Sequence, residues 1–140
     1  MEISDILNMK RSELYCFLID DDEDDREYFA SAIKDLDNNI RLDFASSGAE
    51  AIQKLKRKKS NPPHYIFLDL NMSPMDGKQC LIELKKIPHL AETPVVIYST
   101  YLNERIIYET LQVGAFDHIE KPSHKQGLLN YLKRLLQIAG

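Results

Sequence analysis

Five short apolar runs divide the chain at nearly regular intervals, and their internal patterns differ. The runs cover residues 15–19, 40–45, 65–70, 94–99 and 117–120. The first, third and fourth are almost continuously apolar, as expected of strands that are buried on both faces of a sheet. The second alternates between apolar and polar residues, and the fifth is short. These two patterns are typical of edge strands.

Segments with the helical spacing of apolar residues follow each run. Their apolar positions are Phe29, Ile33 and Leu36; Ile52 and Leu55; Leu81, Leu84 and Ile87; Ile107 and Leu111; and Leu128, Leu132, Leu135 and Leu136. The second helix opens with a Ser-x-x-Glu capping box, Ser47 to Glu50. Pro88 stops the third helix, and Gly114 fits the C-terminal cap of the fourth, which starts near Asn103. The alternation predicts an α/β fold, in which right-handed crossovers build a parallel sheet that helices cover on both sides.

Residues that can bind a cation or a phosphoryl group follow four of the five predicted strands. They are Asp20 and Asp21, then Asp69 and Asn71, then Ser99 and Thr100, and finally Lys121. In a doubly wound sheet, ligands bind at the carboxyl ends of the strands, near the point where the strand order reverses. We therefore expect these side chains to converge on one site.

The run of six acidic residues at positions 20–25 carries a charge of −6, so the rest of the chain sums to +2 within a total of −4. An EF-hand reading of this run fails, because its sixth position is Asp25 instead of glycine and its twelfth is Ser31 instead of glutamate. We divide the run after Asp21. Asp20 and Asp21 end a buried strand, whereas residues 22–25 open a helix in solvent, where acidic side chains suit the helix dipole.

The predicted cluster supplies oxygen ligands, with no histidine or cysteine beside it. Carboxylates brought together repel one another, and a hard cation relieves the repulsion. Mg²⁺ fits such a set far better than zinc. With Lys121 and a hydroxyl opposite, one carboxylate can attack phosphorus and become an aspartyl phosphate.

Composition limits the remaining classes of function. A length of 140 residues with 44% hydrophobic content suits one domain, which we place at residues 14–140 after an N-terminal arm of residues 1–13, with no output domain. The pI near 5.5 does not favour nucleic-acid binding. No apolar stretch is long enough to span a membrane. Cys16 and Cys80 make no disulfide framework, so a reduced, cytoplasmic protein is expected.

Four stretches, taken in this order after their strands, resemble the receiver domains of two-component response regulators. They read FLIDDDEDDRE, YIFLDLNMSPMDG, VVIYST and HIEKP, and the resemblance covers about residues 14–138. It implies a flavodoxin-like (βα)5 fold, a doubly wound parallel five-stranded sheet in the order 2-1-3-4-5. It also implies a single-domain signalling switch that takes part in its own phosphorylation and dephosphorylation and is not otherwise an enzyme.

The same resemblance implies a role for each strand-end acid. Asp69 is the phosphoacceptor, which attacks a phosphohistidine of a histidine kinase or of a histidine phosphotransfer protein. Asp21 and Asp69, with the carbonyl of Asn71, hold Mg²⁺, and Asp20 acts on the ion mainly through water. Asn71 also occupies the position at which the haloacid-dehalogenase phosphatases, a competing class with an aspartyl nucleophile, require an acid.

The resemblance assigns phosphoryl binding to Ser99, Thr100 and Lys121, and switching to Ser99 and His118. Output would pass to a separate protein through the face built from the fourth helix, the fifth strand and the last helix. Three positions depart from the family pattern: the proline of Ser73-Pro74 is shifted by one residue, Thr100 is bulkier than usual, and His118 replaces a tyrosine or phenylalanine. A phosphorylation-independent receiver that acts only as a binding module is the remaining alternative.

Overall fold

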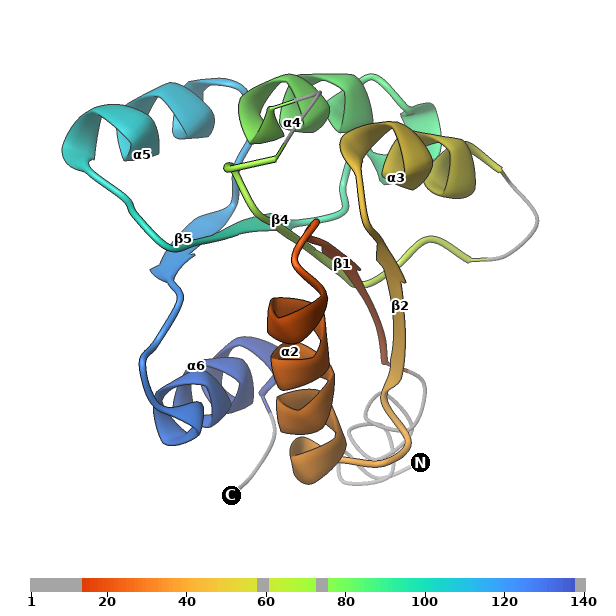
Figure 1. Ribbon diagram of the computed structural model, residues 1–140. Coiled ribbons are helices and arrows are strands. Elements are labelled where there is room, and N and C mark those ends of the chain that lie inside the picture. The colour runs from red at the N-terminus through yellow and green to blue at the C-terminus, as the bar shows by residue number, and fades with distance from the viewer. Residues whose placement is uncertain (1–13, 58–60, 73–75, 138–140) are drawn as a thin grey trace.

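The computed structural model of the protein describes residues 14–57, 61–72 and 76–137 (Figure 1). The predicted arm at residues 1–13 and the shifted proline of Ser73-Pro74 lie outside the described residues. A parallel sheet of five strands has the order β2-β1-β3-β4-β5. The strands are β1 (Tyr15–Ile19), β2 (Arg41–Ala45), β3 (Tyr65–Leu68), β4 (Val95–Ser99) and β5 (Asp117–Glu120). This is the predicted flavodoxin-like order.

Helices cover both faces of the sheet, so the fold has three layers (Figure 1). The helices are α2 (Glu23–Leu36), α3 (Gly48–Lys56), α4 (Gly77–Lys85), α5 (Glu104–Gln112) and α6 (Lys125–Leu136), with a 3-10 turn η1 (Pro88–Leu90) after α4. In Figure 1, α3, α4 and α5 lie on one face, and α2 and α6 lie on the other. None of the described helices combines the length and the apolar character that crossing a bilayer requires.

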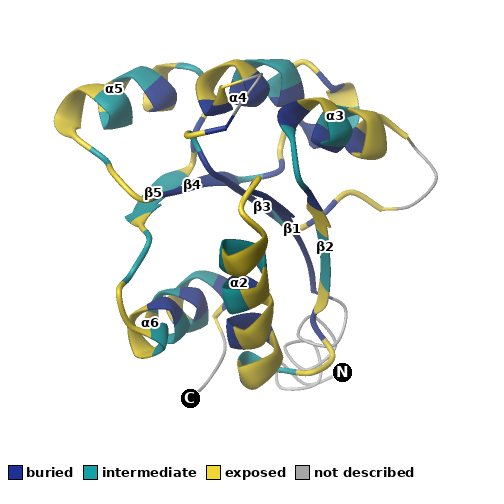
Figure 2. Ribbon diagram, viewed as in Figure 1, coloured by how far each residue is buried: buried dark blue, intermediate teal, exposed yellow. Residues whose placement is uncertain are grey.

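The central strands are buried on both faces, as their apolar runs predicted (Figure 2). Successive side chains of β1 point to opposite faces of the sheet. Phe17 and Ile19 pack in the core beneath α3 and α4, and Cys16 and Leu18 pack in the core beneath α2 and α6. The β2 strand is largely exposed at one edge of the sheet. Burial raises the pKa of the free thiols Cys16 and Cys80 to about 12, so both stay protonated at neutral pH.

The predicted capping box of α3 forms only in part. The Ser47 side chain accepts a hydrogen bond from the backbone N–H of Glu50 at 3.1 Å. The Glu50 carboxylate, however, bonds the hydroxyl of Ser46 at 2.9 Å, one residue before the cap. Gly114 follows the end of α5 with a φ of 112°, the left-handed conformation expected of a C-terminal glycine.

Gly77 lets α4 begin directly against the end of β3. Its N–H donates to the carbonyl of Leu70 at 3.0 Å. A Cβ at this position would lie 2.6 Å from the carbonyl oxygen of Asp69 and would overlap the Cα of Leu70. Only glycine therefore permits this approach, and it fixes the backbone of the loop that carries Asp69.

We expect Gly77→Ala to lower the free energy of unfolding by about 1–3 kcal/mol, because the added methyl group displaces either α4 or the Asp69 loop. Urea denaturation measures this loss. Lys78→Ala is the matched control, since Lys78 is exposed and makes only a solvent-exposed ion pair with Glu109. The control should change stability by no more than about 0.5 kcal/mol. Equal losses in the two variants would contradict the packing argument.

Candidate functional site

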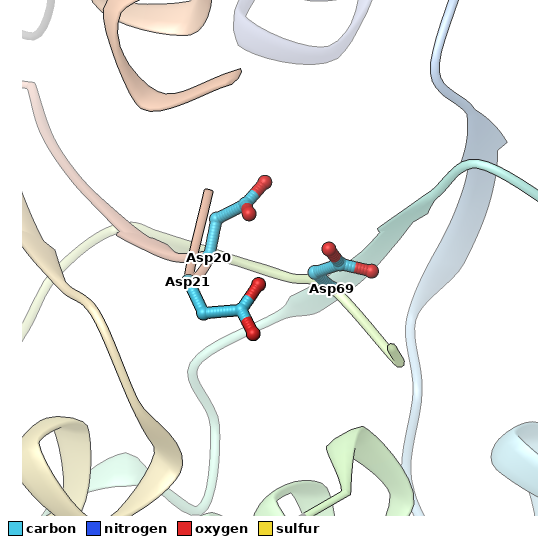
Figure 3. A group of neighbouring side chains, drawn as sticks. All are labelled: Asp20, Asp21 and Asp69. Atoms are coloured by element: carbon cyan, nitrogen blue, oxygen red, sulfur yellow. The ribbon is translucent and has the colours of Figure 1, made fainter. Parts of the chain in front are cut away.

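Parallel pairing of β1 with β3 places Asp20 and Asp69 side by side at the carboxyl edge of the sheet. Ile19 is in register with Leu68, so Asp20 and Asp69, the residues that follow these two, lie next to each other. The N–H of Asp69 donates to the carbonyl of Ile19 at 3.0 Å. One carboxylate oxygen from each of Asp20, Asp21 and Asp69 lies within 4.8 Å of the others. Figure 3 shows these three carboxyl groups gathered where the two strands end.

Asp20 is fully buried, and its surroundings fix its orientation. Its Oδ1 accepts from the backbone N–H of Asp22 at 3.0 Å, and its Oδ2 accepts from Lys121 Nζ at 2.8 Å. Its backbone carbonyl accepts from the Arg26 guanidinium at 2.9 Å. Burial raises the pKa of the Asp20 carboxyl, and the hydrogen bond from Lys121 opposes that rise. Asp20 is therefore a rigidly held ligand candidate, whereas Asp21 is exposed.

Lys121 reaches the cluster from the end of β5. Its backbone N–H donates to the carbonyl of Ser99 at 2.8 Å, which joins the ends of β4 and β5. Its ammonium lies 2.8 Å from Asp20 Oδ2 and 3.1 Å from Asp69 Oδ2. Burial alone would lower the pKa of Lys121, but hydrogen bonds to Asp20 and Asp25 and the charge of Asp69 outweigh burial and raise it. Lys121 is therefore a permanent cation beside Asp69.

Asp25 is the site residue that the sequence prediction missed. We predicted that residues 22–25 open a helix in solvent. Asp25 does lie in the first turn of α2, but its Oδ2 is 2.7 Å from Lys121 Nζ, so the solvated assignment was wrong for this residue. Asp22 behaves as expected, because its side chain caps α2 by accepting from the N–H of Asp25 at 3.0 Å. The only available signal was position: Asp25 lies one helical turn after Asp21, on the side of α2 that faces the strand ends.

Ser99 is fully buried at the end of β4, and it contacts the loop after β3. The side-chain amide of Asn71 donates to the Ser99 hydroxyl at 3.3 Å, and the Asn71 backbone N–H donates to Asp69 Oδ1 at 3.0 Å. Asn71 therefore links the acceptor candidate to the hydroxyl. Thr100 is exposed at the rim, one residue beyond β4.

His118 lies on β5 and bonds helix α5. Its Nε2 is 2.6 Å from the hydroxyl of Thr110, which donates its single hydrogen to the carbonyl of Ile106 at 2.7 Å. His118 and Thr110 are therefore joined by a side-chain hydrogen bond. Burial lowers the pKa of His118, with a smaller opposing effect from Asp117. The side chain thus couples β5 to α5 in its neutral form.

The ligands at the strand ends suit a hard divalent cation. Asp20, Asp21, Asp25 and Asp69 bring four carboxylates against the single ammonium of Lys121. The atoms that face one another are oxygens, which are the ligands that Mg²⁺ and Mn²⁺ prefer. The donor set therefore fits Mg²⁺, with Asp20, Asp21 and Asp69 as the carboxylates close enough to share an ion.

The sequence matches the response regulator receiver domain over residues 16–133. It is 25% identical over 113 residues to the chemotaxis protein CheY of Bacillus subtilis, covering 81% of this chain and 92% of CheY. It is 30% identical over 107 residues to a protein-glutamate methylesterase/protein-glutamine glutaminase of Myxococcus xanthus, covering 76% of this chain but 29% of that protein. The chain belongs to the response regulator receiver domains of two-component signalling. It spans less than a third of the length of the first curated relatives it matches.

Solved structures share the fold. The phosphorylated cyanobacterial phytochrome response regulator RcpA superposes with a TM-score of 0.78 at 27% identity, covering 87% of this chain and 90% of RcpA. The Mn²⁺-bound response regulator Rcp1 superposes with a TM-score of 0.79 at 22% identity, covering 91% of this chain and 97% of Rcp1. The second likeness bears on the fold alone.

The lowered pKa of His118 makes stability depend on pH in a defined direction. Below a pH of about 6.5 the unfolded chain protonates this histidine more readily than the folded protein does. Stability should therefore fall as pH drops from about 7 towards 5. His118→Gln keeps a donor for Thr110 but cannot titrate, so its urea-denaturation midpoint should fall less over the same range. Parallel pH curves for the two proteins would contradict this coupling.

Proposed function

We propose that this chain accepts a phosphoryl group on Asp69 from the phosphohistidine of a histidine kinase or a histidine phosphotransfer protein, in a reaction that requires Mg²⁺. The observation that carries the proposal is the contact of 3.1 Å between Lys121 Nζ and Asp69 Oδ2, beside the Asp20 and Asp21 carboxylates. Membership of the receiver family and the 27% identity to RcpA, a protein solved in its phosphorylated form, support it.

The chemistry assigned to Asp69 is a nucleophilic displacement at phosphorus. One Asp69 carboxylate oxygen forms the new O–P bond while the P–N bond of phosphohistidine breaks, and the departing imidazole nitrogen keeps the electron pair and takes up a proton. The N–H of Asn71 donates to Asp69 Oδ1 and the ammonium of Lys121 donates to Asp69 Oδ2, so the orientation of the carboxylate is fixed. Asp20, Asp21, Asp69 and the Asn71 carbonyl would hold Mg²⁺, which would supply positive charge to offset the crowded oxygens.

Phosphorylation would change the partners of Ser99 and Lys121. The new phosphoryl oxygens are strong acceptors, so they attract the Ser99 hydroxyl and the Lys121 ammonium. Moving Ser99 breaks its contact with the Asn71 amide. Because Lys121 bonds the end of β4 and His118 bonds α5, the change reaches the face formed by α5, β5 and α6. That face carries the signal to a separate protein.

We expect Asp69→Asn to abolish transfer of labelled phosphate from a phosphorylated histidine kinase, because an amide oxygen is too weak a nucleophile. Chelating divalent cations with EDTA should abolish transfer to the wild type, and adding MgCl2 should restore it. Acid-stable and base-labile label on gels measures the product. Labelling of Asp69→Asn at the wild-type rate would refute the assignment. A wild type that takes no label from any kinase or small donor would favour a phosphorylation-independent binding module.

Mg²⁺ should also stabilise the folded protein, since the unfolded chain does not assemble the three carboxylates. At a free concentration ten times the dissociation constant, the gain is about 1.4 kcal/mol. Asp21→Asn should remove most of this gain without creating a buried defect, because Asp21 is exposed. Thermal denaturation with and without MgCl2 measures both effects. An equal Mg²⁺ gain in wild type and variant would place the ion elsewhere.

A further inference from the structure

The ammonium of Lys121 has three N–H donors, and three carboxylates surround it. The contacts are 2.7 Å to Asp25, 2.8 Å to Asp20 and 3.1 Å to Asp69. Asp20 and Asp69 extend from the ends of β1 and β3, whereas Asp25 comes from the first turn of α2. The shortest of the three contacts is thus made from outside the strand ends.

The three carboxylates that contact Lys121 differ in which other groups they could bind. Asp20 and Asp69 belong to the group of oxygens close enough to share an ion, and Asp25 does not. A cation that binds Asp20, and a phosphoryl group that binds Asp69, both compete with Lys121 for those oxygens. The Asp25 carboxylate has no such competitor. It is the contact that continues to hold the ammonium while a cation binds Asp20 and Asp69 reacts.

The setting of this pair separates it from the ordinary ion pairs on the surface. The Lys121 side chain is 11% exposed and that of Asp25 is 41% exposed. In the pair of Arg105 with Glu109 the side chains are 84% and 36% exposed, so the difference between the two pairs lies in the buried cation. Exposed pairs of flexible side chains contribute little. Asp25 is short, and the cap made by Asp22 fixes its backbone at the start of α2. The carboxylate is therefore held in place before any ligand binds.

We propose that Asp25 is a positioning residue that acts through Lys121 by keeping the ammonium beside the phosphorus during transfer to Asp69. This inference rests on the proposed function. Without the Asp25 charge, Lys121 keeps only its contacts with Asp20 and Asp69, for which the cation and the phosphoryl group compete, so its ammonium is no longer held in one position during transfer. The maximal rate of phosphorylation should fall about tenfold, since small displacements of a group that stabilises the transition state cost that much or more.

Asp25→Asn tests the proposal, with Asp24→Asn as the matched control. Both substitutions remove one negative charge from the first turn of α2, but Asp24 is exposed. Phosphoramidate serves as the donor, because a small molecule requires no docking surface. Phosphorylation rates are measured over a range of donor and MgCl2 concentrations. We expect Asp25→Asn to lower the maximal rate with an unchanged half-saturating MgCl2 concentration, Asp24→Asn to match the wild type, and Asp25→Glu to recover part of the rate.

A second measurement uses the protein without metal or donor. The ε-ammonium signal of Lys121 in ¹⁵N NMR should be observable in the wild type and in Asp24→Asn, because three carboxylates hold its protons. It should broaden or vanish in Asp25→Asn. An unchanged signal would overturn the anchoring role. Circular dichroism verifies that Asp25→Asn folds, and Asp25→Ser takes its place if it does not.

The outcomes separate this inference from the proposed function. If the wild type accepts no phosphoryl group, the proposed function fails first. If the wild type is phosphorylated and Asp25→Asn matches it, the positioning role is overturned and the function stands. Equal slowing of phosphorylation in Asp24→Asn and Asp25→Asn would show an effect of net charge. If Asp25→Asn changed only the half-saturating MgCl2 concentration, Asp25 would be a metal ligand. Either result overturns the proposal.

Discussion

The crowding of carboxylates at one edge of the sheet is the constraint on which the rest of the site depends. Four carboxylates face a single ammonium, and two of them, Asp20 and Asp69, are buried where water cannot screen their repulsion. Lys121 contacts three of these carboxylates and offsets part of their repulsion. The remaining charge of these groups is negative, so the cluster attracts a divalent cation.

The backbone holds this charge cluster together against its own repulsion. Asp20 and Asp69 are fixed by hydrogen bonds to strands next to their own, Asp20 to the carbonyl of Ala45 at 3.1 Å and Asp69 to that of Ile19 at 3.0 Å. The strands beneath them are wholly apolar and bury their side chains in two cores. Apolar burial thus supplies the stability that offsets the electrostatic cost of the site, as is common where function requires strain.

Under the proposed function, output depends on single side-chain hydrogen bonds that connect the end of β4 to the loop after β3 and connect β5 to α5. Asn71 bonds Ser99 through a side-chain amide at 3.3 Å, and His118 bonds Thr110 across the gap between β5 and α5. Phosphorylation of Asp69 would draw Ser99 away from Asn71. Protonation of His118 would alter its hydrogen bond with Thr110. Under the same proposal, the surface that a partner binds would include the exposed apolar side chains of Tyr101, Tyr108, Leu111 and Phe116.

Local patterns of period two, and the points where the apolar runs stop, determined from the sequence alone the five strands, the edge positions of β2 and β5, and the strand-end acids. The order of the strands came from the resemblance to the receiver family and not from these patterns. It could not assign Asp25, whose type and place in a helix start fit a solvated residue equally well. Nor could it show that Glu50 bonds Ser46, that His118 bonds Thr110, or that Gly77 touches the Asp69 loop. Those contacts join residues whose distance is set by how helices pack on the sheet. Packing depends on the whole chain at once, so only the tertiary structure decided them.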